Sequence, residues 1–194
     1  MKWMIGGLLL ASAAIGMAQS SQPDPARMKR IWGSMMERIT VQTDFWFEDG
    51  EFPRCIHLLR VQNVLDPKDY EIATNLGWML ENVQQYDEAL ATYVRFKIQN
   101  PNDKEAPYPE ANFYFMKKAY AKVPPLLEPT LVKKPHPNTY RILAHSYERM
   151  SLFADAMRVW DSYLKLNPAD GAAKANRKRV EDKMKNGAKP KKSL

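Results

Sequence analysis

Prolines at a fixed interval constrain this chain more than any other feature of its sequence. Pro67, Pro101 and Pro135 follow one another at intervals of 34 residues. Each closes a stretch in which small, aromatic and aliphatic residues recur in a similar order. A fixed period of this length is the signature of an array in which each unit is one supersecondary element. The chain is therefore predicted to fold as a series of similar units.

The last copy shows the pattern most clearly. It runs Tyr140-x2-Leu143-Ala144-x2-Tyr147, then Phe153, Ala156-x3-Trp160, Leu166 and Pro168. The second copy keeps Leu76-Gly77, Tyr86, Ala89-x3-Tyr93 and Pro101, with Ala73 and Leu80 at the places of the aromatic pair. This pattern resembles that of the tetratricopeptide repeat, W-x2-L-G-x2-Y, then A-x3-F, then P.

The first and third copies are less regular. In the first, Trp46, Gly50, Phe52, Cys55-x3-Leu59, Leu65 and Pro67 agree with the pattern, whereas Ile39, Gln42 and Thr43 depart from it. In the third, small and aromatic residues stand in place at Ala111, Tyr114 and Tyr120. Pro124 and Pro125 can occupy a first helical turn, but Pro129 would remove an interior hydrogen bond. A kink or a short helix is expected there.

The resemblance implies an all-α fold, a right-handed superhelical solenoid of antiparallel helix-turn-helix hairpins. The expected domain spans 31–169, with repeats at about 36–69, 70–103, 104–136 (degenerate) and 137–169. A capping helix over 170–186 and a disordered basic tail over 187–194 complete this prediction. Small residues allow the two helices of a hairpin to approach, and aromatic residues fill the space between neighbouring hairpins.

The first eighteen residues are typical of a secretory signal peptide. Lys2 precedes an apolar run from Trp3 to Met17, and small residues stand before an expected cleavage near Ala18. Retention of this segment as an N-terminal anchor is the alternative. Residues 19–30 are expected to form a flexible lead. The mature protein is then expected to be exported, either periplasmic or extracellular.

The formal net charge of +7 is concentrated at the C-terminal end. Residues 174–194 hold nine basic and two acidic residues, whereas residues 19–173 hold nineteen and twenty. One interpretation is a solubilising cap for the array. The other is docking on an anionic membrane or envelope polymer through Lys174, Arg177, Lys178, Arg179, Lys183 and Lys185. Nucleic acid is not an expected partner, because no aromatic residues alternate with these cations.

The sequence holds no pattern of an enzyme or a metal site. Its three histidines lack a metal-ligand spacing, and neither a G-x-S-x-G motif nor a glycine-rich phosphate loop is present. The acidic residues Asp44, Glu48, Asp49 and Glu51 are interpreted as a solvated helix end. The single cysteine, Cys55, is expected to be packed and inert. The chain is therefore predicted to have no catalytic activity and no cofactor.

The resemblance implies a concave groove lined by the first helix of each hairpin. The positions that correspond to its lining are Asp44, Phe47, Glu48, Trp78, Glu81, Asn82, Asn112, Phe115, Arg141, His145, Glu148 and Arg149. Aromatic residues in such a groove can serve as binding hot spots. The equally weighted alternative is that Trp78 and Phe115 pack between adjacent first helices.

Repeat domains of this kind that grip a chaperone's C-terminal carboxylate use lysine, arginine and asparagine at fixed places. Here only Asn75 matches, while Thr40, Asp44, Glu105 and Pro109 stand at the other places, so this subclass is not predicted. The preferred hypothesis is a protein–protein interaction module, acting as an adaptor, scaffold or assembly factor that binds a peptide or protein segment in the cell envelope. The alternative is an envelope tether or spacer whose basic tail docks on an anionic surface.

Overall fold

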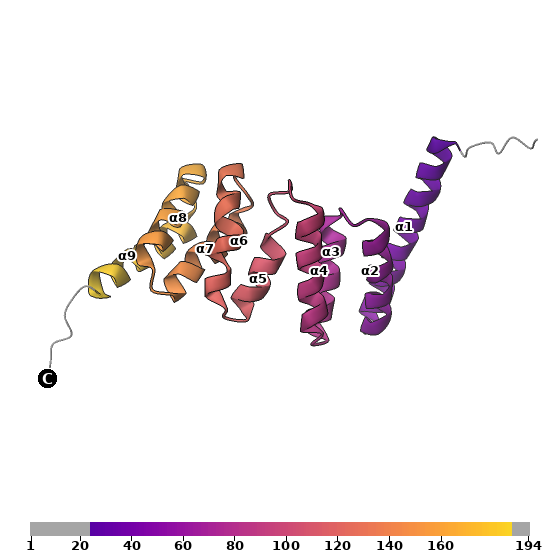
Figure 1. Ribbon diagram of the computed structural model, residues 1–194, viewed down its shortest axis with the longest axis horizontal. Helices are drawn as coiled ribbons and strands as arrows, with labels where there is room; N and C mark the ends of the chain where they lie inside the picture. Colours follow the sequence, from indigo (N-terminus) through magenta and orange to yellow (C-terminus); the bar gives the residue numbers. More distant parts are fainter. Residues whose placement is uncertain (1–23, 188–194) are drawn as a thin grey trace, which may run out of the picture. The chain divides into compact units, whose positions relative to one another are not determined.

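The computed structural model describes residues 24–187, and this part of the chain is helical throughout, without a strand (Figure 1). The predicted signal peptide, residues 19–23 of the lead and residues 188–194 of the tail lie outside the described residues. The chain divides into two compact units, of which the first ends at Arg38 and the second begins at Ile39. The second unit carries the repeats.

The helices alternate with short connections. Their bounds are α1 Pro25–Glu48, α2 Phe52–Leu65, α3 Tyr70–Asn82, α4 Tyr86–Gln99, α5 Tyr108–Met116, η1 Tyr120–Lys122, α6 Pro124–Leu127, η2 Glu128–Lys133, α7 Pro137–Arg149, α8 Phe153–Leu166 and α9 Gly171–Gly187, where η marks 3₁₀ helices. Helices that follow one another in the chain pack side by side: α2 on α3, α3 on α4, α4 on α5, α7 on α8 and α8 on α9. This nearest-neighbour packing confirms the predicted helical solenoid.

Each hairpin turns through one residue in the left-handed conformation. That residue is Gly50 (φ 77°), Gln84 (φ 63°), Lys118 (φ 60°) or Ser151 (φ 63°). The next N–H donates to a carbonyl five residues earlier, from Glu51 to Trp46, Gln85 to Leu80, Ala119 to Tyr114 and Leu152 to Tyr147, at 2.8–2.9 Å. This bond closes a Schellman motif, which ends the first helix and satisfies its last carbonyls. All four copies, including the degenerate third, therefore share one turn.

The connection between hairpins is set by a polar residue before the proline and a cap after it. Asp66, Asn100 and Asn167 end α2, α4 and α8, and a proline follows each of them. The proline restricts the preceding residue to extended conformations, so the helix stops there. Two residues beyond the proline, Asp69 and Asp170 cap the next helix by accepting a backbone N–H at 2.9 Å.

The core lies both within each hairpin and between neighbouring hairpins. In the second hairpin Gly77 lets the Tyr93 ring approach the backbone of α3, and in the fourth Leu143 and Trp160 are fully buried. The last helix, α9, adds Ala173 and Val180 to the same core. Its packing on α8 confirms a capping helix, although Met184 near the C-terminal end of α9 is 47% exposed.

The third copy forms one regular helix, α5, and then short pieces. Pro124 begins α6, as expected, and α6 gives way to the 3₁₀ helix η2 where Pro129 would disrupt an α-helix. The copy also buries Glu110, which stands where the second and fourth copies have Leu76 and Leu143. Lys97 of α4 donates to Glu110 at 2.5 Å, so the buried carboxylate is paired.

The flexible lead predicted over 19–30 is wrong for residues 25–30, because α1 begins at Pro25. Proline is well suited to a first helical position, where its missing N–H would have no helical partner. Asp24 accepts the N–H of Ala26 at 3.0 Å and so caps the helix. The sequence contains both signals, but the loop prediction rested on Pro23, Asp24 and Pro25, residue types that are also common in loops.

We predict opposite effects for two reciprocal substitutions in equivalent turns. Gln84→Gly should raise the free energy of unfolding by about 1 kcal/mol, because a left-handed residue with a Cβ is strained. Gly50→Gln should lower it by a similar amount for the same reason. Urea denaturation followed by circular dichroism measures both. Equal effects of the same sign would contradict the turn assignment.

A second prediction concerns the close approach at Gly77. A Cβ there would overlap the ring of Tyr93, so Gly77→Ala should destabilise the array by about 2 kcal/mol. Gly33 is the matched control, since it also lies within a helix and an added Cβ would meet nothing within 4 Å. Gly33→Ala should be neutral or stabilising in the same urea titration. A neutral Gly77→Ala would show that Tyr93 can move without cost.

Candidate functional site

The predicted groove residues lie on α1, α3, α5 and α7, the first helix of each hairpin. They differ in their exposure and in their contacts with other parts of the chain. Those of the first two copies include large side chains that remain exposed, whereas in the fourth copy Glu148 is bonded by α9 and Arg141 by Asp170.

Three aromatic side chains meet at the surface of the first two hairpins. Phe47 of α1 lies with its ring centroid 5.7 Å from Phe52 of α2 and 6.1 Å from Trp78 of α3. Their side chains are 42%, 40% and 51% exposed. We call these three residues the aromatic patch. Trp78 thus contacts the neighbouring first helix, as one interpretation expected, while half of its surface stays open to solvent.

Phe52 is the member that the groove prediction missed. It follows the left-handed turn at Gly50 and begins α2, so a pattern restricted to first helices excludes it. The signal available in the sequence was an aromatic residue two positions after the glycine. A shared turn geometry places that residue beside the end of the first helix, where Phe47 lies.

Acidic side chains accompany the aromatic patch. Asp44 and Glu48 are exposed on α1, and Asp44 lies three residues before Phe47 and so on the same helix face. Glu81 lies three residues after Trp78, is half-buried, and accepts a hydrogen bond from the Tyr93 hydroxyl at 2.9 Å. Burial, followed by the Glu81 charge, raises the pKa of Tyr93. The tyrosine therefore stays a neutral donor that fixes Glu81.

The amide of Asn82 is held by its own helix. Its Nδ2 donates to the carbonyl oxygen of Trp78 at 2.8 Å, and the side chain is otherwise exposed. In the third copy, Phe115 stacks edge-on against Tyr120 at 5.6 Å and is half-buried at the border of the core. Asn112 is half-buried as well. Phe115 therefore matches the packing interpretation better than that of an exposed anchor.

In the fourth copy Glu148 is buried rather than open to a partner. Arg179 and Lys183, both of α9, each donate to it at 2.7 Å, and His145 lies 3.3 Å away on its own helix. Burial alone would raise the pKa of Glu148, but the hydrogen bonds from the two cations outweigh it and hold the pKa at about 2. Glu148 thus acts as an attachment point for the capping helix.

Two further residues of the fourth copy serve the same connection. Arg141 donates to Asp170 at 3.2 Å and to Asn138 at 3.2 Å. His145 packs edge-on against the buried Trp160 at 5.4 Å. Arg149 is exposed. Of the four residues predicted for this copy, Arg149 alone is classed as exposed. The other three contact α9, Asp170 or Trp160.

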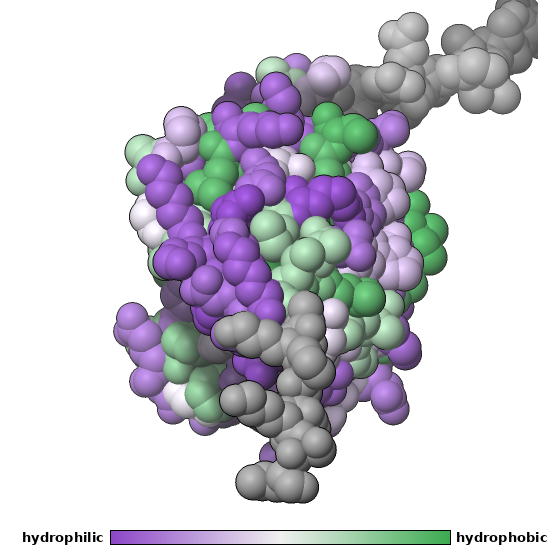
Figure 2. All heavy atoms as spheres, turned by 90° about the vertical axis from the view of Figure 1, so that its left-hand side faces the viewer, coloured by the Kyte–Doolittle hydropathy of each residue, from purple (hydrophilic) through white to green (hydrophobic). Residues whose placement is uncertain are grey.

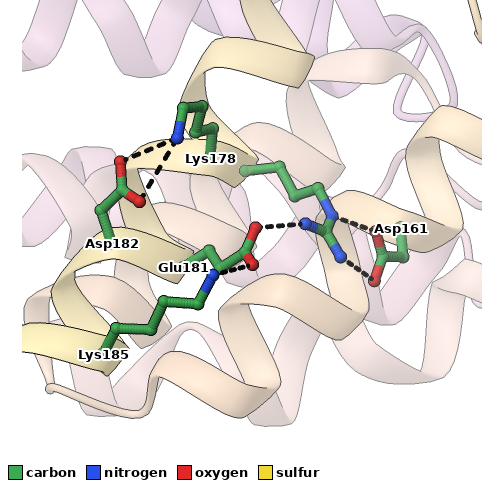
Figure 3. Close-up of polar contacts among 6 residues, drawn as sticks. Asp161, Lys178, Glu181, Asp182 and Lys185 are labelled. Atoms are coloured by element: carbon green, nitrogen blue, oxygen red, sulfur yellow. Dashed lines mark hydrogen bonds and ion pairs between the residues drawn. The ribbon is translucent and has the colours of Figure 1, made fainter. Parts of the chain in front are cut away.

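The basic residues of α9 are mostly paired within the chain (Figure 3). Arg177 bonds Asp161 at 2.6 Å and Glu181 at 3.0 Å, while Lys185 bonds Glu181 at 2.5 Å. Lys178 pairs with Asp182 at 3.3 Å. Figure 2 looks at the end of the array where α9 lies and shows hydrophilic side chains over much of that face. These contacts favour the cap interpretation of the basic helix, because its cations bond the protein itself.

Other kinds of site find no support between residues 24 and 187. No cluster of three or more histidine, cysteine or acidic side chains could hold a metal ion in this range. None of the helices described there has the length and hydropathy to span a bilayer. Cys55 is fully buried, its thiol contacts the Thr43 carbonyl at 3.4 Å, and burial raises its pKa. A raised pKa keeps the thiol protonated and unreactive.

Comparison with known proteins identifies the fold. Neither a protein family model nor a curated protein matches the chain. Among solved structures, a tetratricopeptide repeat protein from Parabacteroides merdae is similar, with a TM-score of 0.58 and 16% identity over 77% of this chain and 59% of that one. MamA from Desulfovibrio magneticus RS-1 has a TM-score of 0.56 at 16% identity, covering 77% and 91%. MamA of AMB-1 has a TM-score of 0.56 at 18% identity, covering 76% and 87%. The chain thus has the tetratricopeptide-repeat fold.

The ion pairs of Glu148 predict a specific response to acid. Because its pKa is depressed from 4.5 to about 2, its stabilising contribution is complete above pH 4.5 and is lost as the pH falls toward 2. Glu148→Gln should lower the free energy of unfolding by about 2 kcal/mol at neutral pH, allowing for the solvent exposure of its two cations.

The difference between the wild type and Glu148→Gln should shrink between pH 4.5 and pH 2. Urea denaturation at a series of pH values measures it. Glu48→Gln is the matched control, because Glu48 is also the last acidic residue of a first helix but is exposed. A Glu148→Gln chain as stable as the control at neutral pH would contradict the role of Glu148 in attaching α9.

Proposed function

We propose that this protein is a protein–protein interaction module whose partner segment binds at the aromatic patch of the first two hairpins. The observation that carries the proposal is the exposure of Phe47, Phe52 and Trp78 beside one another. Large aromatic side chains supply much contact area at low conformational cost, which is why they dominate binding hot spots. A segment laid along the first helices would bury the patch.

The charges near the patch favour a basic and apolar partner segment. Asp44 and Glu48 on α1 and Glu81 on α3 accompany the aromatic side chains. Lysine or arginine in the partner would complement them and steer association, while an aliphatic or aromatic anchor would pack on the exposed faces of Phe47 and Trp78.

The contacts at the other end of the array also support this location. Arg179 and Lys183 form ion pairs with Glu148, and Asp170 forms one with Arg141. A partner that binds at the fourth copy would have to break these ion pairs. Displacing a paired, buried carboxylate costs several kcal/mol, about 3 or more. The first two copies require no such rearrangement.

Within this proposal the protein acts as an adaptor, scaffold or assembly factor without chemistry of its own. The cell envelope is the proposed location, on the basis of the apolar N-terminal run and the small residues before Ala18. The alternative, a tether whose basic C-terminal end docks on an anionic surface, has less support, since Arg177, Arg179 and Lys183 already bond acidic side chains of the chain.

The test is selection of peptides from a random display library against the purified chain, followed by measurement of each Kd by fluorescence anisotropy. We expect the selected peptides to combine an aromatic or aliphatic anchor with lysine or arginine. Trp78→Ala and Phe47→Ala should each weaken binding about thirtyfold, the size of a hot-spot effect of 2 kcal/mol.

The matched control is Ile98→Ala, because Ile98 is an apolar residue on α4 that is still more exposed, at 68%. It should leave the Kd unchanged. Selected peptides that bind the Phe47 and Trp78 variants as tightly as the wild type would refute the patch as the binding site. Peptides rich in acidic residues would instead refute the charge argument.

A further inference from the structure

The N-terminal part of α1, residues 25–38, is an amphipathic helix whose apolar side chains are in large part exposed. Met28 is 47%, Ile31 52% and Trp32 40% accessible, while Met35 and Met36 are half-buried. All five belong to the first compact unit, which ends at Arg38. Exposed apolar side chains that are adjacent, rather than scattered, indicate a binding surface.

These side chains form a single stripe along the helix. At about 100° per residue, the five fall within an arc of about 140°, the width of one helix face. We call Met28, Ile31, Trp32, Met35 and Met36 the apolar stripe. The opposite side of the helix carries the charged residues Arg30 and Glu37. A stripe of this width matches a helix that lies half-immersed in an apolar phase.

Cations border the apolar stripe on both sides. By the same helical spacing, Arg27 and Arg38 lie beside Ile31 at one edge, and Lys29 lies beside Met36 at the other. One shallow surface is indeed lined by Ile31 and Met35 together with Arg38. Residues 25–38 contain four basic residues and one acidic residue, so the helix is net positive.

We propose that residues 25–38 bind the surface of a membrane that contains anionic phospholipids. The apolar stripe would enter the boundary between headgroups and acyl chains, and Trp32 would occupy the interface that its amphipathic ring favours. Arg27, Lys29 and Arg38 would extend their charged ends to the phosphates while their apolar stems cover the edges of the stripe. The proposal does not depend on a partner at the aromatic patch.

The cations at both edges of the apolar stripe favour lipid over a second copy of this helix as the bound partner. Two such helices packed stripe to stripe would bring Arg27 and Arg38 of one chain close to the basic rows of the other, and like charges across a contact are unfavourable. Anionic headgroups offer complementary charge along both edges at once. Attraction to such a surface contributes about 1 kcal/mol for each basic residue close to it.

The experiment is vesicle co-flotation of the chain from Gln19 to Leu194, which lacks the apolar run of residues 3–17 that would bind lipid by itself. Vesicles contain equal parts of phosphatidylglycerol and phosphatidylcholine, or phosphatidylcholine alone. We expect binding to the anionic vesicles that is at least about tenfold stronger than to the neutral ones and that weakens as salt is added. Equal binding to both vesicles, or none to the anionic ones, would overturn the proposal.

Two pairs of variants locate the binding surface. Ile31→Ser should lower the partition coefficient about tenfold, whereas Ile98→Ser, at a more exposed isoleucine on α4, should not change it. The double variant Arg27→Glu/Lys29→Glu should abolish the preference for anionic vesicles. Lys68→Glu/Lys174→Glu makes the same charge change at two exposed lysines outside this helix and should preserve it. If in either pair the control variant reduced vesicle binding more than the variant in residues 25–38, the proposal would be overturned.

A third measurement guards against misfolding of the variants. Bromine-labelled lipids should quench the tryptophan fluorescence of the wild-type chain, and Trp32→Phe, which keeps an aromatic side chain, should remove most of this quenching while vesicle binding persists. Quenching that survives Trp32→Phe would place another tryptophan in the lipid and overturn the assignment. Concentration-dependent self-association in the absence of lipid that Ile31→Ser abolishes, without any vesicle binding, would assign the stripe to a second copy instead.

Discussion

The contact between one hairpin and the next is the interaction on which the array depends, because a pair of short helices cannot bury its apolar side alone. The contact works only if every hairpin has the same geometry, and the left-handed turn closed by a six-residue hydrogen bond supplies that geometry in all four copies. The turn survives in the third copy, where the second helix breaks into short pieces. The four turns therefore share one geometry although they differ in sequence. The left-handed residue is glycine in the first turn, Gly50, whereas Gln84, Lys118 and Ser151 adopt the strained left-handed conformation in the other three. Stacking in the following hairpin offsets this strain.

An array of this kind has to end, and the contacts that close the C-terminal end determine which side chains of the last repeat stay exposed. Here α9 places Val180 in the core of the last hairpin and attaches through Arg179 and Lys183 to Glu148. The closure therefore uses Glu148, one of the residues predicted to line a groove in the fourth copy. Towards the other end, Phe47 packs against Phe52 and Trp78, and Phe47 and Trp78 keep about half of their surface exposed. Exposed aromatic surface is therefore distributed unevenly along the repeats.

Much of the fold could be predicted from the sequence, because the positions of small residues and prolines follow from packing within each repeat. Gly77 and Trp160 have the surroundings that the pattern implied, and Pro129 ends an α-helix as expected. The site was less accessible to such reasoning. The exposure of a predicted groove residue depends on which distant parts of the chain pack against it. Nothing near Glu148 in the sequence indicates that two cations more than thirty residues away will bond it. Phe52 joins the patch for the same kind of reason, since a turn brings it to Phe47. The helix at residues 25–30 was missed because the cap at Asp24 and the proline after it also occur in loops.

The formal charge of +7 is a poor guide to electrostatic behaviour in this protein, and the structure gives the physical reason. A cation attracts a distant anionic surface only to the extent that its field is not cancelled nearby. Arg177 and Arg179 lie within 3.0 Å of carboxylates, so each forms a local dipole whose field decays faster than that of a single charge. On residues 25–38 the cations instead border exposed apolar side chains, and there attraction and burial act at the same surface. A small net charge beside an apolar stripe can therefore bind a membrane more strongly than a larger charge on a capping helix. The spacing of cations relative to apolar side chains, rather than their number, determines which segment meets an anionic surface.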